Sequence, residues 1–224
     1  MASKYSTDSK FERSSIQYLK NKDIFEDLDI IDVVWTDDEE TQKTGSDLIA
    51  TIKGETNQVV DIKSVAFSIP TFSQEIINGK SEKVGWIMNN ELATDYLLFV
   101  WHNVNADNYT DGKLKIIKDL SCINYTDISL CKKKDMQDLI YKEIGIKCND
   151  KAANFILSEI KRINSKKSIS YYTVDRDNKC LREIEDKSKR NIYISYSKNI
   201  HERPINFIVR KSLINSISKN IRVF

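Results

Sequence analysis

The chain has few of the residues that mark several common classes of protein. It is 224 residues long and contains only 2 prolines, 6 glycines and 2 histidines. None of its 4 cysteines forms a Cys-x-x-Cys pair, so the spacing of a zinc site is absent. There is no internal repeat, and no stretch rich in glycine, proline or serine divides the chain. The sequence therefore predicts one domain over residues 1–224.

The sequence also lacks an export signal and a long apolar run. Met1 leads into a polar segment, and no apolar stretch approaches the length of a membrane span. We therefore expect a cytoplasmic protein that does not contact membranes, with reduced thiols at Cys122, Cys131, Cys148 and Cys180. A nucleophilic Cys–His arrangement stays open, with His102 and His201 as the two histidines, although no local motif favours it.

Charge is divided unevenly along the chain. Hydrophobic residues make up 40% of the sequence, which is enough for a core, and the net charge is only +2. Residues 1–112 carry 10 Lys and Arg against 20 Asp and Glu, whereas residues 113–224 carry 25 against 13. A basic half of this kind could neutralise the phosphates of a nucleic acid. The alternative is that the two halves attract each other, within one chain or across a homodimer.

Two short apolar runs carry the strongest functional signal. The first follows Thr44–Asp47 and alternates apolar residues at Leu48, Ala50 and Ile52, and the second is Val59–Lys63. The polar, glycine-containing segment Lys53–Asn57 between them predicts a β-hairpin. Residues two apart share one face of a strand, so the apolar residues are predicted to face a core and the charged residues to face away from it.

The charged residues of this hairpin are predicted to form one cluster. Asp61 and Lys63 share a strand face, and a turn centred on Glu55 would place Asp47 opposite Lys63. Two carboxylates on adjacent strands are a suitable ligand set for Mg²⁺, which takes its remaining oxygens from water and substrate phosphate. Mg²⁺ activates its bound water for attack on phosphorus, and Lys63 is placed to hold that water or to offset developing negative charge.

These residues resemble the motif of a known group of nucleases. The segment Gly45–Ala50 followed by Asp61-Ile62-Lys63 is similar to the restriction-endonuclease-like superfamily, the PD-(D/E)XK nucleases, in particular its Mrr-like and Holliday-junction-resolvase-like branches. Ser46 stands where the superfamily name has proline. The resemblance implies an α/β fold with a central mixed sheet flanked by helices, cleavage of DNA or RNA with Mg²⁺ or Mn²⁺, and Glu12 on a first helix as a further acid.

The triplet Asp/Glu-x-Lys is not specific by itself. It occurs six times in the chain, at Asp8, Asp61, Asp111, Glu159, Asp177 and Glu185. Only the copy at Asp61 lies in an apolar run that follows a Gly-x-Asp segment at hairpin distance. The structural alternative is that Asp47 ends a loop and that Asp61 and Lys63 form the solvated face of an ordinary strand.

The remaining segments are predicted in outline. Residues 9–22 form a helix, and 30–35 a strand, followed by an acidic loop at 37–40. Thr71 is predicted to cap a helix over 71–78, on which Glu75 is either an exposed carboxylate, the favoured interpretation, or an auxiliary ligand. Residues 95–101 are predicted to form a buried strand. Further predictions are a strand at 115–125, helices at 136–144 and 152–163, strands around Tyr171 and Tyr193, and a strand entering a final helix over 205–213.

Together these observations predict a restriction-endonuclease-like domain with additional C-terminal helices and strands. Residues 9–104 are expected to form its catalytic core and residues 113–224 a basic half. We expect a Mg²⁺-dependent endonuclease, with Asp47 and Asp61 as metal ligands and Lys63 and Glu12 as further catalytic residues. DNA is preferred to RNA, and restriction-type cleavage of a duplex by a homodimer is the favoured subtype. A junction-resolving or phage-associated nuclease, an inactive nucleic-acid-binding or protein-binding module and an unrelated small-molecule enzyme remain alternatives.

Overall fold

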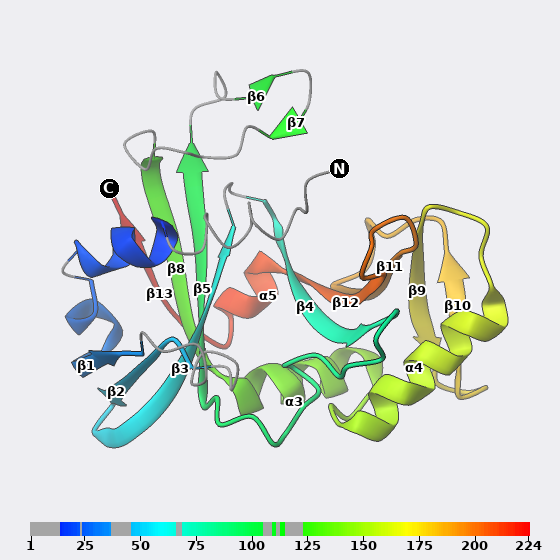
Figure 1. The fold of residues 1–224 in the computed structure, drawn as a ribbon, viewed down its shortest axis with the longest axis horizontal. Helices are drawn as coiled ribbons and strands as arrows, with labels where there is room; N and C mark the ends of the chain where they lie inside the picture. The colour runs from blue at the N-terminus through cyan, green and yellow to red at the C-terminus, as the bar shows by residue number, and fades with distance from the viewer. Residues whose placement is uncertain are drawn as a thin grey trace. The chain divides into compact units, whose positions relative to one another are not determined.

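The protein is described by a computed structural model that covers residues 14–22, 24–36, 46–65, 69–104, 109–110, 113–114 and 123–224. The chain divides into two units that each draw on separate stretches of sequence (Figure 1). Unit 1 comprises residues 1–69, 94–132 and 218–224, and unit 2 comprises residues 70–93 and 133–217. In the described residues, no helix has both the length and the apolar composition needed to cross a bilayer. The fold is α/β.

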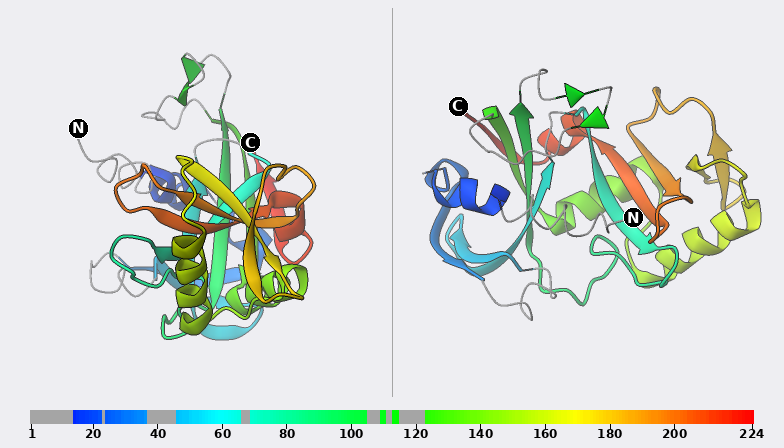
Figure 2. Two further views of the ribbon diagram at one scale, coloured as in Figure 1. Left: turned by 90° about the vertical axis from the view of Figure 1, so that its right-hand side faces the viewer. Right: turned by 45° about the horizontal axis from the view of Figure 1, so that its top comes forward.

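Unit 1 contains a six-stranded mixed sheet in the order β1-β2-β3-β5-β8-β13. Its strands are β1 (Ile30–Trp35), β2 (Leu48–Ile52), β3 (Glu55–Val65), β5 (Tyr96–Val104), β8 (Ile123–Lys132) and β13 (Lys219–Val223). Only β3 and β5 pair in parallel, and the other neighbours are antiparallel (Figure 2). A 3-10 helix, η1 (Glu26–Leu28), and a two-stranded ribbon of β6 (Tyr109–Thr110) and β7 (Lys113–Leu114) complete the unit.

One face of this sheet packs on a hydrophobic core, as the alternation of apolar residues predicts. Its buried side chains include Leu48, Ala50 and Ile52 of β2 together with Val60 and Ile62 of β3. The helical residues 14–20 cover this core, and Ser15 and Leu19 are fully buried there. The predicted first helix is therefore confirmed for residues 14–20. The opposite face of β2 and β3 carries the charged residues.

The β2–β3 hairpin forms as predicted, but with a tighter turn. Lys53 and Gly54 both have positive φ angles, 51° and 82°, as in the two-residue turns that join antiparallel strands. The turn is thus at Lys53–Gly54 and not centred on Glu55. Leu48 pairs with Val60, and Asp47 donates its backbone N–H to the carbonyl oxygen of Val60. The expectation that Asp47 lies opposite Lys63 is therefore wrong, since this register brings Asp47 beside Asp61.

Unit 2 contains a five-stranded antiparallel sheet in the order β10-β9-β11-β12-β4, with three helices. Its elements are β4 (Thr71–Asn78), α3 (Lys133–Ile144), α4 (Asp150–Ile163), β9 (Ile169–Asp175), β10 (Cys180–Ile184), β11 (Ile192–Ser197), β12 (Pro204–Arg210) and α5 (Lys211–Asn215). The predicted helices at 136–144 and 152–163 and the late strand entering a helix are confirmed. The helix predicted over 71–78 is wrong, because this segment is β4 and pairs with β12.

The two units differ in charge. Unit 1 carries 14 Lys and Arg against 19 Asp and Glu, a net charge of −5, and unit 2 carries 21 against 14, a net charge of +7. The boundary between the two units differs from the one that the sequence suggested, which separated residues 9–104 from residues 113–224. Residues 113–132 and 218–224 belong to unit 1. By net charge, a polyanion would therefore be attracted mainly to unit 2.

Candidate active site

Asp47 is held at the start of β2 by backbone hydrogen bonds to both neighbouring strands. Its N–H donates to Val60 of β3 at 2.9 Å, and its carbonyl oxygen accepts from the N–H of Thr36 at 3.0 Å. The hydroxyl of Thr36 donates to the carbonyl oxygen of Ser46 at 2.6 Å. These contacts fix the backbone of Asp47 next to β3, so its side chain has few alternative positions.

Asp61 and Lys63 lie on the face of β3 that points away from the unit 1 core. Lys63 Nζ is 2.8 Å from Asp61 Oδ1, as the spacing of two residues along a strand allows. The Asp61 side chain is only 5% exposed, whereas that of Lys63 is 25% exposed. The prediction that Asp61 and Lys63 share one face is confirmed. Asp61 is not part of a solvated strand face, because it is almost completely removed from water.

The Asp47 carboxyl group reaches across to β3. Its Oδ2 accepts a hydrogen bond from the backbone N–H of Ile62 at 2.6 Å. The pKa of Asp47 is raised from 3.8 to about 7, first by burial and then by the charge of the neighbouring Asp61 and a hydrogen bond between the two carboxyl groups. The Ile62 N–H and the Lys63 ammonium group oppose this shift in the pKa. Two carboxyl groups that influence each other in this way lie in one cluster.

The cluster contains more negative than positive charge. Two carboxyl groups share one ammonium group, and Asp61 Oδ2 is buried with no hydrogen-bond donor among the described residues. A buried carboxylate oxygen without a donor is unfavourable by roughly 1–3 kcal/mol or more. The cluster therefore favours either a proton on one carboxyl group or a bound cation. This combination of hard oxygen ligands suits a divalent ion such as Mg²⁺.

The structure brings together three of the four predicted site residues, Asp47, Asp61 and Lys63. Glu12 lies outside the described residues. Glu75, predicted as an auxiliary ligand on a helix, lies instead on strand β4 of unit 2. Within the described part of the chain, no group of three or more His, Cys, Asp or Glu side chains is arranged to hold a metal ion. The candidate centre is therefore a pair of carboxyl groups with one lysine.

The three lysines where β8 leads into α3 have structural partners. Lys132 contacts Glu55, Lys133 is buried and donates to the carbonyl oxygen of Asn89, and Lys134 pairs with Asp138. In the described part of the chain, Cys131, Cys148 and Cys180 form no disulfide. Burial raises the pKa of Cys148 to about 12, so its thiol is protonated at neutral pH and is a poor nucleophile.

A buried polar chain in unit 1 was not anticipated from the sequence. His102 is fully buried, with Nε2 at 2.8 Å from the Ser15 hydroxyl and Nδ1 at 2.9 Å from that of Thr126. Ser15 also lies 2.7 Å from Ser64 Oγ. The four residues come from the first helix, β3, β5 and β8, and short sequence motifs do not reveal such long-range contacts. Because Ser15 and His102 are both completely inaccessible, the chain stabilises the packing of helix on sheet.

Burial lowers the pKa of His102 to about 4, from its ordinary value of 6.5. The His102 imidazole is protonated at a higher pH in the unfolded chain than in the folded protein. The contribution of His102 to the free energy of unfolding is therefore present above pH 6.5 and is lost as the pH falls to 4. We expect this contribution to the free energy of unfolding to fall by about 3 kcal/mol over that range. Urea unfolding of wild type and His102→Gln at pH 7 and pH 4.5 measures it.

The matched control for this prediction is His201→Gln, because His201 is exposed. The His201 variant should keep the pH dependence of the wild type, whereas that of the His102 variant should be weaker. Identical pH dependence in wild type and the His102 variant would contradict the burial of a neutral imidazole.

Comparison of the chain with protein-family models, with curated proteins and with solved structures finds no match.

Proposed function

We propose that this chain is a Mg²⁺-dependent endonuclease that hydrolyses phosphodiester bonds of DNA, with Mn²⁺ able to replace Mg²⁺. Asp47 and Asp61 are the proposed metal ligands. The observation that carries the proposal is the burial of two adjacent carboxyl groups against a single lysine, with Asp61 Oδ2 lacking a donor. An ordinary structural ion pair needs only one carboxylate for each lysine, so the second acid supports a site that binds a cation.

Each residue has a distinct role in this proposal. Asp61 is fixed by β3 and presents its unpartnered oxygen, and Asp47 adds a second oxygen from the start of β2. A bound Mg²⁺ supplies an activated water and stabilises charge on the phosphate. Lys63 lies 2.8 Å from Asp61 and is the group that would orient the water or offset charge on the scissile phosphate. Its pairing with a carboxylate argues against a role as the base.

The arrangement of strands gives further support to a restriction-endonuclease-like core. The motif lies on a β-hairpin within a mixed sheet, and the strand carrying Asp61 and Lys63 pairs in parallel with β5. One feature differs from the expected order, because the described residues of the connection between these two strands contain β4 and no helix. Cleavage of duplex DNA by a homodimer remains the proposed subtype, with a junction-resolving or phage-associated nuclease as its variant.

A second candidate is a binding module without catalytic activity, on the same fold. The hydrogen bond from Ile62 to Asp47 favours this alternative, since through it the Asp47 carboxyl group could simply join β2 to β3. In that case the carboxyl pair has a structural role and Mg²⁺ is not required.

Supercoiled plasmid incubated with the protein distinguishes the two candidates. We expect nicked and linear products with Mg²⁺ or Mn²⁺ and none with EDTA. Sequencing of fragment ends from a digest of mixed genomic DNA would show whether cleavage occurs at discrete sites, and a parallel RNA digest tests the alternative substrate. If DNA binds but plasmids, branched junctions and RNA all remain intact with both metals, the binding module is correct.

A further inference from the structure

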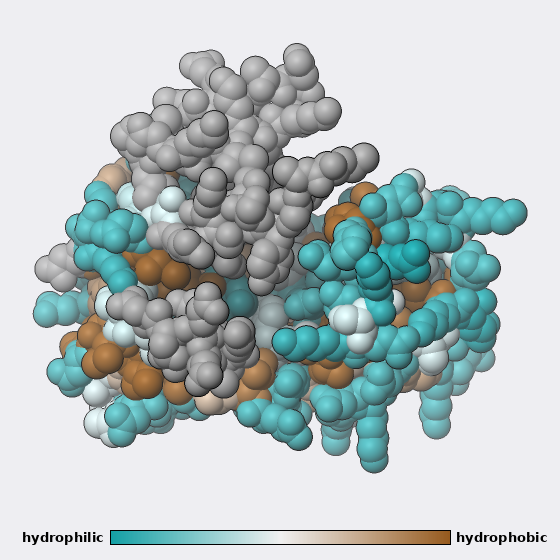
Figure 3. All heavy atoms as spheres, viewed as in Figure 1, coloured by the Kyte–Doolittle hydropathy of each residue, from teal (hydrophilic) through white to brown (hydrophobic). Residues whose placement is uncertain are grey.

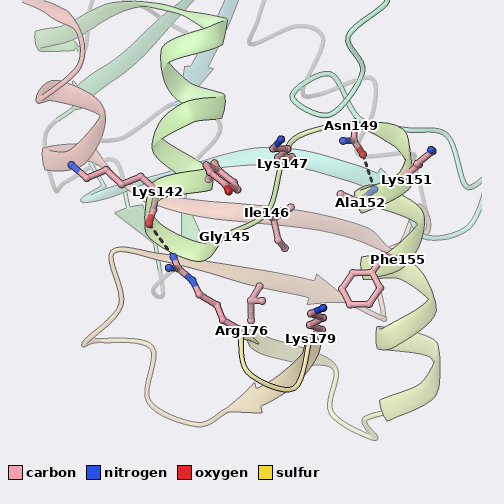
Figure 4. A pocket seen from close by; sticks show the side chains of 12 residues that line it. Lys142, Gly145, Ile146, Lys147, Asn149, Lys151, Ala152, Phe155, Arg176 and Lys179 are labelled. Carbon is pink, nitrogen blue, oxygen red and sulfur yellow. Dashed lines mark hydrogen bonds between the residues drawn. The ribbon is translucent and has the colours of Figure 1, made fainter.

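Unit 2 contains a cleft that the proposed cleavage site does not explain. Its volume is about 770 Å³, within the range of ligand-binding clefts. It lies between the end of α3, the beginning of α4 and the turn after β9 (Figure 4). Its walls are formed by Tyr141, Lys142, Gly145, Ile146, Lys147, Asn149, Lys151, Ala152, Phe155, Val174, Arg176 and Lys179.

The charge of this cleft is of one sign. Five of its twelve lining residues are Lys or Arg, and none is Asp or Glu. Lys147, Lys151 and Lys179 have exposed side chains, and in the described part of the chain none of the three makes an ion pair. Three solvated ammonium groups around one hollow repel one another and attract an anion. The cleft is therefore complementary to a ligand that carries several negative charges.

Two aromatic side chains line the same cleft and remain exposed. Tyr141 is 50% and Phe155 is 38% exposed, although both are large apolar residues. Lys147 Nζ lies 5.9 Å from the centre of the Tyr141 ring, so a cation and a flat apolar surface lie side by side. A ligand made only of phosphate would not use the rings. A strand of nucleic acid uses both the rings and the lysines, since its bases stack on aromatic rings and its phosphates contact lysines.

The cleft is held in shape by the folded chain. Gly145 ends α3 with a φ of +79°, and its N–H donates to the carbonyl oxygen of Tyr141. Arg176 Nη2 donates to the carbonyl oxygen of Lys142 at 2.9 Å, which joins the turn after β9 to the end of α3 (Figure 4). A Cβ on Gly145 would come within 2.9 Å of Arg176 Nε, so glycine permits this close approach. The walls need little rearrangement to accept a ligand.

A second hollow continues the basic surface. It has a volume of about 260 Å³, shares Val174 and Arg176 with the first, and adds Lys189 and Arg190, with Glu143 as its acid. The aromatic cluster of Tyr171 and Tyr193 is a weaker candidate, because Lys187 already covers the Tyr171 ring at 4.0 Å. The surface of the unit around α4 is mostly hydrophilic (Figure 3), which suits an extended charged ligand.

We propose that this cleft binds a single-stranded segment of nucleic acid, with Tyr141 and Phe155 stacking on bases and Lys147, Lys151 and Lys179 contacting phosphates. Paired bases stack on each other within a duplex and leave no free face for the two rings. An unpaired segment exposes those faces. The inference goes beyond the proposed cleavage, because a protein without nuclease activity would bind the strand in the same way.

Fluorescence anisotropy with a labelled 15-residue oligothymidylate, in EDTA and at several salt concentrations, tests this site. We expect the double variant Tyr141→Leu/Phe155→Leu to bind about tenfold more weakly, with the salt dependence unchanged. The double variant Lys147→Met/Lys179→Met should also bind more weakly, and its slope of log K against log[salt] should fall by about 1.4, since each phosphate contact of a single strand contributes roughly 0.7. Both double variants should lose less affinity for a duplex of equal length than for the single strand, because paired bases do not stack on the two rings.

Two controls keep the test specific. Lys166→Met removes an exposed lysine that follows the opposite end of α4, and it should change neither affinity nor salt slope. Tyr141→Phe/Phe155→Tyr keeps both rings and should bind like the wild type. Unchanged binding of the single strand by the leucine variant, or an equal loss with Lys166→Met, would each overturn the proposal. Because EDTA prevents cleavage, failure of this test is independent of failure of the nuclease proposal.

Discussion

Replacing Asp61 with asparagine is expected to lower the rate of plasmid cleavage at least about 1,000-fold. Asparagine keeps the size of the side chain but removes the charge that holds Mg²⁺, and loss of metal-assisted charge stabilisation is worth roughly 4 kcal/mol of activation free energy. The change also leaves Lys63 without its carboxylate partner at 2.8 Å. Initial rates of plasmid nicking at saturating Mg²⁺ measure the effect.

The chain offers a matched control for this substitution. Asp177 begins another copy of the Asp-x-Lys triplet, Asp177-Asn178-Lys179, but lies exposed on the turn between β9 and β10. Asp177→Asn should cleave at the wild-type rate. Equal activity of Asp61→Asn and wild type, with both proteins folded by circular dichroism, would show that this carboxylate takes no part in catalysis.

Asp47→Asn is expected to make the EDTA-treated protein more stable at pH 8, by up to about 4 kcal/mol. The folded protein holds a proton on Asp47 up to about pH 7, whereas the ordinary pKa of the group is 3.8. The stability that this proton contributes is complete below pH 4 and is lost as the pH rises through 7. Asparagine stays neutral at every pH and still accepts from the Ile62 N–H, so the variant avoids the loss.

Urea unfolding of both proteins at pH 4.5, 6 and 8 measures this difference. The gap between the variant and the wild type should widen with increasing pH, while cleavage by the variant should be strongly reduced. Greater stability with lower activity is typical of a site where like charges are held together for function. A variant less stable than the wild type at pH 8 would instead indicate that ionised Asp47 supports the fold.

The alternation of residues in the hairpin is local information, and it predicted the faces of β2 and β3 correctly. Leu48 and Val60 are buried, and Asp61 and Lys63 lie on the other face. The register was not predictable in the same way. It depends on Lys53 adopting a positive φ and on a register irregularity between Ala50 and Ile52, which the residue types alone do not specify.

Contacts between distant segments account for the elements that were missed. Pro70 and Thr71 resemble the beginning of a helix, but Phe72, Ile76 and Ile77 are buried in a sheet through pairing with β12, more than 120 residues later in the chain. Strand β13 was also not predicted, and it forms by pairing with β8. In both cases the partner strand, and not the local pattern, determines the structure.

In the candidate site, too, some features follow from the local sequence and others only from the folded environment. Residue types and strand spacing identified Asp61 and Lys63, and the Gly-x-Asp segment identified Asp47. The burial of Asp61, the hydrogen bond from Ile62 and the pKa of Asp47 depend on the folded environment. The cleft in unit 2 was not predicted, because α3, α4 and the turn after β9 meet only in the folded unit.

Calorimetric titration with Mn²⁺ tests the central claim most directly, namely that Asp47 and Asp61 together bind a divalent cation. At pH 7 Asp47 is about half protonated, so binding should release roughly half a proton, read from the heats in two buffers with different ionisation enthalpies. We predict this release for the wild type and no binding by Asp61→Asn. Equal binding by both proteins, or no binding by either, would contradict the account.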